Sequence, residues 1–190
     1  GLFISNNGGT TWTIAPGTDA MPVMRLASVC IDFSNDQIIY LGTGDHNYYY
    51  SGSGVWKSTD GGNTFAPLGL SGKLVIDMIM DPANANTIVA ITNTGIYKTT
   101  NAGSTWTLKT ASRAFDDLKA KANSTTRTLC AATTDSAFFR STDFGDTWTQ
   151  INAGIVLPSG VTNGNGVRLG VTPADSNVVY LSMVANGGMV

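Results

Sequence analysis

An eight-residue pattern that occurs four times constrains this chain more than any other feature of its sequence. One copy is Ser58-Thr59-Asp60-Gly61-Gly62-Asn63-Thr64-Phe65, and the shared form is [Ser/Thr]-x-[Asp/Asn]-x-Gly-x-Thr-[Trp/Phe]. The four copies, called boxes below, are Ser5–Trp12, Ser58–Phe65, Thr99–Trp106 and Ser141–Trp148. Such a repeat indicates an array of similar units.

The repeat extends beyond the box. Each box follows a short aromatic run, and these runs start at Gly1, Gly54, Gly95 and Ala137, with a fifth start at Gly188. The spacings are 53, 41, 42 and 51 residues, which is the length of a four-stranded propeller blade. The sequence therefore predicts an all-β propeller segment with blade periods of about 1–53, 54–94, 95–136 and 137–187.

Two further strands are expected before each aromatic run. The predicted inner strands are Arg25–Asp32, Lys73–Met80, Phe115–Lys121 and Val167–Thr172, and the second strands are Ile38–Gly42, Ile88–Thr92, Thr128–Ala132 and Val178–Ser182. Turn-forming residues separate them at 32–36, 81–86, 123–126 and 173–177. Each box would then join the third strand to the fourth, outermost one.

The composition agrees with a turn-rich β protein. All 13 acidic residues are Asp, a residue that favours turns, whereas Glu favours helix interiors. A net charge of −2 with 13% charged residues provides no basic stripe for nucleic acid. No apolar run reaches the length of a membrane span.

The box residues have a structural interpretation. The Asp or Asn side chain accepts backbone N–H groups inside a tight turn, the Gly supplies a positive φ, and the aromatic residue packs between neighbouring blades. Asn replaces Asp in two boxes, which favours hydrogen bonding over acid–base chemistry. The set of predicted structural residues is Ser5, Asn7, Gly9, Thr11, Trp12, Ser58, Asp60, Gly62, Thr64, Phe65, Thr99, Asn101, Gly103, Thr105, Trp106, Ser141, Asp143, Gly145, Thr147 and Trp148.

These boxes resemble the Asp-box (BNR) repeats of bacterial sialidases, sortilin-type receptors, xyloglucanases and photosystem assembly factors. The longer pattern, with Asp81-Pro82-Ala83-Asn84 before Gly95-Ile96-Tyr97-Lys98 and the Thr99 box, is most similar to the sortilin and xyloglucanase type. The resemblance implies a β-propeller over nearly the whole chain. It implies no single activity, because the relatives share the scaffold and differ in chemistry.

The face opposite the boxes is expected to carry the variable loops Ala15–Met24, Gly42–Ser53, Lys109–Ala114 and Ile151–Gly166. Gly42–Ser53 holds the only histidine, and its candidate ligand-binding residues are Asp45, His46, Tyr48, Tyr49 and Tyr50. Loop tyrosines provide amphipathic contact area for sugars and proteins. The alternative is that they pack on the rim of the blade. His46 is a weak candidate for a metal ligand or base because there is no second histidine.

A second set of candidates comes from the inner strands. Aligning them places Ser28, Asp77, Asp117 and Arg168 at one position, which predicts a polar channel. Asp77, Asp116, Asp117 and Arg168 are candidates for contacting a ligand there, and a water-filled channel lining is the alternative.

Known catalytic patterns are not found. The resemblance to sialidases would require an Arg-Ile-Pro start and a Tyr–Glu pair, and the chain has neither. A xyloglucanase-like Asp pair suits an all-Asp chain, but no catalytic residue can be assigned. We expect no metal and no cofactor. Cys30 and Cys130 are expected to be buried free thiols, with a disulfide as the alternative.

The sequence thus predicts an extracellular or cell-surface scaffold that binds glycan or protein. A xyloglucanase-like glycoside hydrolase with catalytic residues partly outside the segment is one alternative, and a protein assembly factor is another. We expect the chain to belong to a larger propeller. The other possibility is a closed four-bladed ring in which Gly1–Thr13 pairs with Val167–Ser182.

Overall fold

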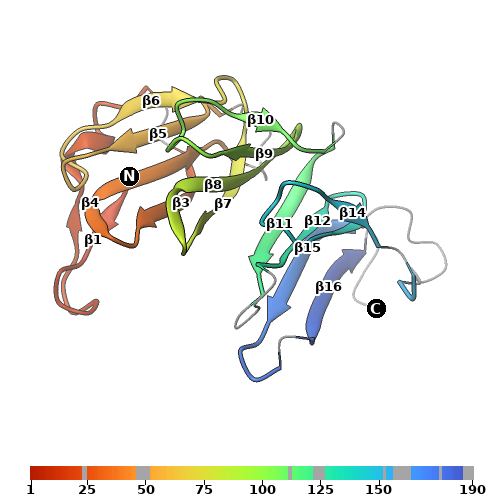
Figure 1. Ribbon diagram of the computed structural model, residues 1–190. Helices are drawn as coiled ribbons and strands as arrows, with labels where there is room; N and C mark the ends of the chain where they lie inside the picture. The colour runs from red at the N-terminus through yellow and green to blue at the C-terminus, as the bar shows by residue number, and fades with distance from the viewer. Residues whose placement is uncertain are drawn as a thin grey trace. The chain divides into compact units, whose positions relative to one another are not determined.

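The computed structural model describes residues 1–22, 25–45, 52–110, 113–121, 127–151, 153–155, 164–175 and 177–185 (Figure 1). Within these residues the chain forms β-strands and one 3₁₀ turn, η1 (Pro16–Thr18), with no α-helix. Among them, no helix is long and apolar enough to cross a membrane.

Three antiparallel sheets have four strands each, in simple up-and-down order. The first contains β3 (Leu26–Asp32), β4 (Asn35–Thr43), β5 (Val55–Ser58) and β6 (Ala66–Gly69). The second contains β7 (Val75–Asp81), β8 (Asn84–Thr92), β9 (Gly95–Thr99) and β10 (Thr107–Leu108). The third contains β11 (Phe115–Ala120), β12 (Leu129–Thr133), β13 (Phe138–Ser141) and β14 (Thr149–Gln150).

Two further sheets have two strands each. One pairs β1 (Phe3–Ile4) with β2 (Thr13–Ile14), which correspond to the third and fourth strands of the repeat. The other pairs β15 (Gly164–Val171) with β16 (Val179–Ala185), which correspond to the first and second strands. The predicted four-strand order is therefore confirmed in the three four-stranded sheets, and each two-stranded sheet contains one neighbouring pair of that order.

In the first and second four-stranded sheets, the turns between the first and second strands are shorter than the sequence predicted. In the first sheet Asp32 pairs with Asn35, so only Phe33 and Ser34 form the turn. In the second sheet only Pro82 and Ala83 do so. The predicted turns 32–36 and 81–86 were too long because Asn and Asp, which favour turns, here extend the paired strands. Asp32 still has a turn role, since its Oδ1 accepts the backbone N–H of Ser34 (2.8 Å).

The strands form two compact units. The first consists of Gly1–Ile88 and Thr99–Trp106, and the second of Val89–Lys98 and Thr107–Val190. In the first unit Met21, Ile39 and Leu41 form a core with Ile4 and Phe65, which joins β1 to the first four-stranded sheet. In the second unit Cys130, Ala132, Val167 and Leu169 join the third sheet to β15. Both cores lie between sheets, as the stacking of blades requires.

Both cysteines are free and buried, as expected. Burial raises the pKa of Cys30 to about 11 and also raises the pKa of Cys130. A thiol that stays protonated at neutral pH is a poor nucleophile.

Candidate functional site

The box turns are held together by hydrogen bonds from their own side chains. In the turn between β5 and β6, the Ser58 hydroxyl donates to Asp60 Oδ1 (2.7 Å) and accepts the N–H of Gly62 (2.8 Å). Asp60 in turn accepts the N–H of Thr64 on Oδ1 (2.9 Å) and its hydroxyl on Oδ2 (2.6 Å). The Gly62 φ of 91° is one that only glycine adopts readily. The box side chains therefore satisfy the polar groups of their own turn.

The other three boxes repeat this hydrogen-bond pattern. The N–H of Gly9, Gly103 and Gly145 donates to the hydroxyl of Ser5, Thr99 and Ser141 at 2.8, 2.9 and 2.8 Å. The two Asn boxes keep it by donating from the amide nitrogen to the Thr hydroxyl, as in Asn7 Nδ2 to Thr11 (2.7 Å) and Asn101 Nδ2 to Thr105 (2.9 Å). The first box residue, to which the sequence assigned no mechanism, is the central acceptor of the turn.

The box carboxylates are poorly suited to proton transfer at neutral pH. The hydroxyl and N–H of Thr64 hold the pKa of Asp60 at about 2. For Asp143, burial acts to raise the pKa, but the hydrogen bonds from Thr147 and Ser141 outweigh it and bring the pKa to about 2. Groups that stay ionised from about pH 3 upward do not act as general acids.

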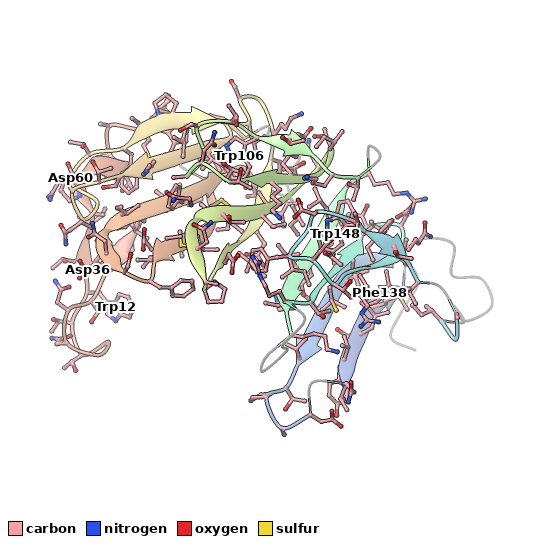
Figure 2. All side chains as sticks on the ribbon, viewed as in Figure 1. Trp12, Asp36, Asp60, Trp106, Phe138 and Trp148 are labelled. Atoms are coloured by element: carbon pink, nitrogen blue, oxygen red, sulfur yellow. The ribbon has the colours of Figure 1, made fainter. Side chains whose placement is uncertain are left out.

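The box aromatic residues differ in burial, and Figure 2 labels three of them, Trp12, Trp106 and Trp148. Phe65, Trp106 and Trp148 are half-buried, and the indole of Trp106 lies against Gly69 of β6, where a Cβ atom would approach Trp106 Cδ1 to 2.9 Å. The Trp12 side chain is 61% exposed among the described residues, and its packing between blades stays a prediction. Its Nε1 donates to the carbonyl oxygen of Gly9 within its own box (3.0 Å).

Two of the inner-strand candidates, Asp116 and Asp117, are buried carboxylates at 4% and 5% exposure. A β-bulge between Phe115 and Asp117 disturbs the alternation of β11, so both neighbours reach β15. Asp116 accepts the N–H of Val167, and Asp117 accepts the N–H of Leu169 (2.6 Å). These carboxylates thus hold the backbone of β15 beside β11.

Arg168 and Lys119 neutralise this pair of carboxylates. The Arg168 guanidinium lies 3.1 Å from Asp116 Oδ1, with a side chain that is 65% exposed, and the Lys119 ammonium contacts Asp117 Oδ1 at 2.5 Å. The structure thus brings Asp116, Asp117 and Arg168 together. Of the three, Arg168 offers the most surface to solvent, and a role in ligand contact stays a prediction.

Asp77 belongs to the first unit, on β7. It is half-buried, and its Oδ1 accepts the N–H of Met78 (2.8 Å). Asp117 makes the same bond to Leu118 (2.9 Å), so the alignment of inner strands in the sequence matches equivalent positions in the fold. Contact of Asp77 with a ligand stays a prediction.

The loop between β4 and β5 is attached to the sheet at Thr43 and at residues 52–54. Hydrogen bonds and close packing hold these two ends together, and this junction is called the neck below. The hydroxyl of Thr43, which is buried, accepts the N–H of Ser53 (2.8 Å) and donates to the carbonyl oxygen of Gly54 (2.7 Å). Gly52 is packed so closely that a Cβ atom would lie 2.2 Å from the carbonyl oxygens of both Thr43 and Lys73. Ser53 also accepts the indole N–H of Trp56 (2.7 Å).

The other two four-stranded sheets have the same hydrogen-bonded neck, but a short turn stands in place of the loop. Thr92 donates to the carbonyl oxygen of Gly95 (2.9 Å) across a turn of only two intervening residues. Thr133 accepts the N–H of Ala137 (2.9 Å). Residues 44–53 are therefore an insertion into a standard hairpin, attached at a site where the strand register is preserved. The sequence showed these threonines at the ends of second strands, but their shared role was not predicted.

The described part of this loop begins with an ion pair between Asp45 and Arg25 (2.5 Å), whose side chains are 23% and 42% exposed. His46, Tyr48, Tyr49 and Tyr50, the other candidates in this loop, lie outside the described residues. Within the described ranges, no group of three or more His, Cys, Asp or Glu side chains could hold a metal ion.

Comparison with known proteins identifies the family. The family model described as Sortilin, neurotensin receptor 3, matches residues 53–163, which is more than half of the chain. The chain belongs to the Sortilin-Vps10 family. The family match covers three of the four boxes and the second and third four-stranded sheets. No curated protein sequence matches the chain.

Solved structures show the same fold at low sequence identity. An ancestral GH74 enzyme matches 98% of the chain over 27% of its own length, with a TM-score of 0.68 and 20% identity. An auxiliary nutrient binding protein from Bacteroides thetaiotaomicron matches 85% of the chain over 36% of its own length, with a TM-score of 0.57 and 13% identity. A YCF48 protein bound to a D1 peptide matches 68% of the chain over 42% of its own length, with a TM-score of 0.50 and 16% identity.

These matches and the three four-stranded sheets confirm the predicted all-β propeller fold. The chain spans between 27% and 42% of the length of the three structures. At such identities the likeness concerns the fold alone.

Proposed function

We propose that this chain is part of an extracellular or cell-surface propeller that binds a glycan or a protein through the loop at residues 44–53. The observation that carries the proposal is the inserted loop on the Thr43 neck. The corresponding turn after Thr92 has two residues, and a functional insertion on an otherwise regular scaffold is the usual way in which repeat proteins acquire a binding site.

The chemistry of the loop supports recognition. It contains three consecutive tyrosines, His46 and Asp45 in a chain with only 13% charged residues. Tyrosine contributes a large apolar face and a hydroxyl group, with few rotatable bonds to order on binding. The neck restricts the loop at both ends, which reduces the entropy that a ligand must remove.

The experiment is a screen of the purified protein against a glycan array and a peptide array, followed by titration of the ligands found. The variant Tyr48→Ala/Tyr49→Ala/Tyr50→Ala is expected to weaken binding at least about tenfold, as the loss of central aromatic contacts does. Tyr180→Ala is the matched control, because Tyr180 is 65% exposed on β16. Unchanged binding by the triple variant would remove the loop from the site.

A glycoside hydrolase is the second candidate, supported by the GH74 match over 98% of the chain. An all-Asp chain suits a pair of catalytic carboxylates. Incubating the protein with xyloglucan and related polysaccharides and measuring new reducing ends tests this directly. Sustained turnover would replace the binding-only proposal, whereas binding without turnover would favour it.

An assembly factor is the third candidate, supported by the match to YCF48 bound to a D1 peptide. A hit confined to the peptide array, with no glycan bound, would favour this function.

A further inference from the structure

We infer that Arg25 is a positioning residue for ligand binding, because its ion pair with Asp45 fixes the start of the loop at residues 44–53. The inference rests on the proposed binding function of that loop. Arg25 Nη1 lies 2.5 Å from Asp45 Oδ2. Arg25 directly precedes β3, and Asp45 follows Thr43, the last residue of β4, by two positions. The pair therefore joins the beginning of the inner strand to the beginning of the inserted loop.

The backbone brings the two side chains together before they pair. The N–H of Gly44 donates to the carbonyl oxygen of Arg25 (2.9 Å). Gly44 has a φ of 119° and is closely surrounded, since a Cβ atom there would lie 2.4 Å from Leu74 Cδ1 and 3.2 Å from Gly52 Cα. Because the neighbouring backbone is already held, the ion pair orders less chain than a pair between two mobile segments would, and more of its attraction remains as stabilisation.

The third four-stranded sheet contains the same arrangement without an inserted loop. Arg113 Nη1 lies 3.5 Å from Asp135 Oδ2, and Asp135 stands two positions after the threonine of its neck, as Asp45 does in the first sheet. The N–H of Thr134 donates to the carbonyl oxygen of Ala114 (3.1 Å), next to Arg113. The recurrence indicates that an aspartate at this position serves the scaffold. We therefore assign Asp45 to holding the loop rather than to contacting the ligand.

The second four-stranded sheet forms its neck with an uncharged residue at this position. There Thr94 stands where the other two sheets have aspartate, and its hydroxyl lies 3.2 Å from that of Thr92. Thr92 still donates to the carbonyl oxygen of Gly95 (2.9 Å). The neck thus needs no ion pair, so removing the Arg25 side chain should leave the neck and the fold of the first sheet intact.

The consequence of losing the pair falls on the loop. With the pair in place, the loop is held at Asp45 and at Gly52, and residues 46–51, which include the three tyrosines, lie between these positions. Without the pair, the chain after Gly44 has one attachment fewer. A ligand that binds the tyrosines must then remove more conformational entropy from the loop, which lowers its affinity.

The test compares Arg25→Met with the matched control Arg113→Met, since methionine keeps an unbranched apolar stem and removes the charge. One readout is the Kd for a ligand found on the arrays. The other is the rate at which chymotrypsin, which cleaves after aromatic residues, cuts the folded protein at Tyr48, Tyr49 or Tyr50, with the cuts located by mass spectrometry. Proteases cut a folded chain where a segment leaves its structure locally. Urea midpoints establish that both variants fold.

We expect Arg25→Met to raise the Kd and the cleavage rate by about two- to fivefold each, the range for a partly exposed ion pair. Arg113→Met should change neither. The charge reversal Arg25→Asp/Asp45→Arg should restore much of both, which a merely structural role for the arginine would not produce. Faster cleavage with unchanged affinity would overturn the positioning role. Weaker binding in Asp45→Asn but not in Arg25→Met would also overturn it, because Asp45 would then contact the ligand itself.

The two readouts separate this inference from the proposed function. If the triple tyrosine variant binds as tightly as the wild type, the loop is not the binding site and the proposed function fails. The cleavage rate still judges the ion pair in that case. Faster cleavage in Arg25→Met would support the attachment of the loop by Arg25, and an unchanged rate would overturn it.

Discussion

The box hydroxyl is predicted to stabilise the fold more than its small size suggests, and Ser58→Ala tests this. The Ser58 side chain is 1% exposed, and Gly62, whose N–H it accepts, is also buried. Replacing the hydroxyl leaves that N–H without an acceptor and removes one hydrogen bond from Asp60. An unsatisfied buried donor costs about 1–3 kcal/mol, so the free energy of unfolding should fall by about that amount.

Ser5→Ala is the matched control. Ser5 makes the same two bonds, to the N–H of Gly9 (2.8 Å) and to Asn7 Oδ1 (3.0 Å). Gly9 is exposed, so water replaces the lost acceptor, and the free energy of unfolding should change by less than about 0.5 kcal/mol. Ser58→Thr should retain stability, because Thr99 makes the same contacts in its own box.

The assay is urea denaturation of the three variants, combined with amide hydrogen exchange at Gly62. A lower midpoint with an unchanged slope identifies a loss of stability rather than a change in the denatured state. The Gly62 amide should lose protection in Ser58→Ala. If Ser58→Ala and Ser5→Ala reduced stability equally, burial of the box hydroxyl would not be the source of its contribution.

Three further outcomes are expected. The pKa of both Asp60 and Asp143 lies at about 2, below the ordinary 3.8, so their contribution to stability is complete above about pH 5 and declines as the pH falls towards 2. In urea titrations from pH 6 to pH 2, the stability of Asp60→Asn/Asp143→Asn should therefore depend less on pH than that of the wild type. Identical pH dependence in the two proteins would contradict this. The buried Lys98 ammonium (5% exposed) lies 2.7 Å from the carboxylate of Asp146, which is 52% exposed. In thermal unfolding, Asp146→Ala should reduce stability by about 1–3 kcal/mol because it leaves a buried ammonium without this partner, whereas Lys98→Met should be nearly neutral. An equal loss of stability in both variants would argue against this. Thr43→Val and Thr92→Val should each lower the free energy of unfolding by about 1–2 kcal/mol. Only Thr43→Val should weaken ligand binding, because only the Thr43 hairpin carries the inserted loop. Weaker binding in both variants would show that the affinity does not depend on the loop.

The sequence predicted the strand order and the role of the box because both depend on local chemistry that repeats. The Gly at the fifth position of each box needs a positive φ, and each short aromatic run becomes a strand, regardless of the surroundings. The exposure of Trp12 among the described residues could not be predicted in this way. A tryptophan packs between blades only where a neighbouring sheet covers it, and that depends on contacts distant in sequence.

The inner-strand carboxylates show a second limit. The polar position shared by Asp77 and Asp117 was visible in the alignment of strands, and it suggested a channel. The bulge at Asp116 was not visible, because an extra residue in a strand leaves no mark in composition. That bulge directs two consecutive carboxylates to the backbone of β15. The same limit applied to Lys98 and Asp146, whose pairing joins positions 48 residues apart.

The central claim is that the boxes build the scaffold and the inserted loop recognises the ligand. The most direct test is a single series of titrations with a ligand from the arrays, comparing wild type, Asp60→Asn and Tyr48→Ala/Tyr49→Ala/Tyr50→Ala. We predict an unchanged Kd for the box variant and a Kd raised at least about tenfold for the loop variant. A Kd that rises in Asp60→Asn and stays constant in the loop variant would contradict the claim.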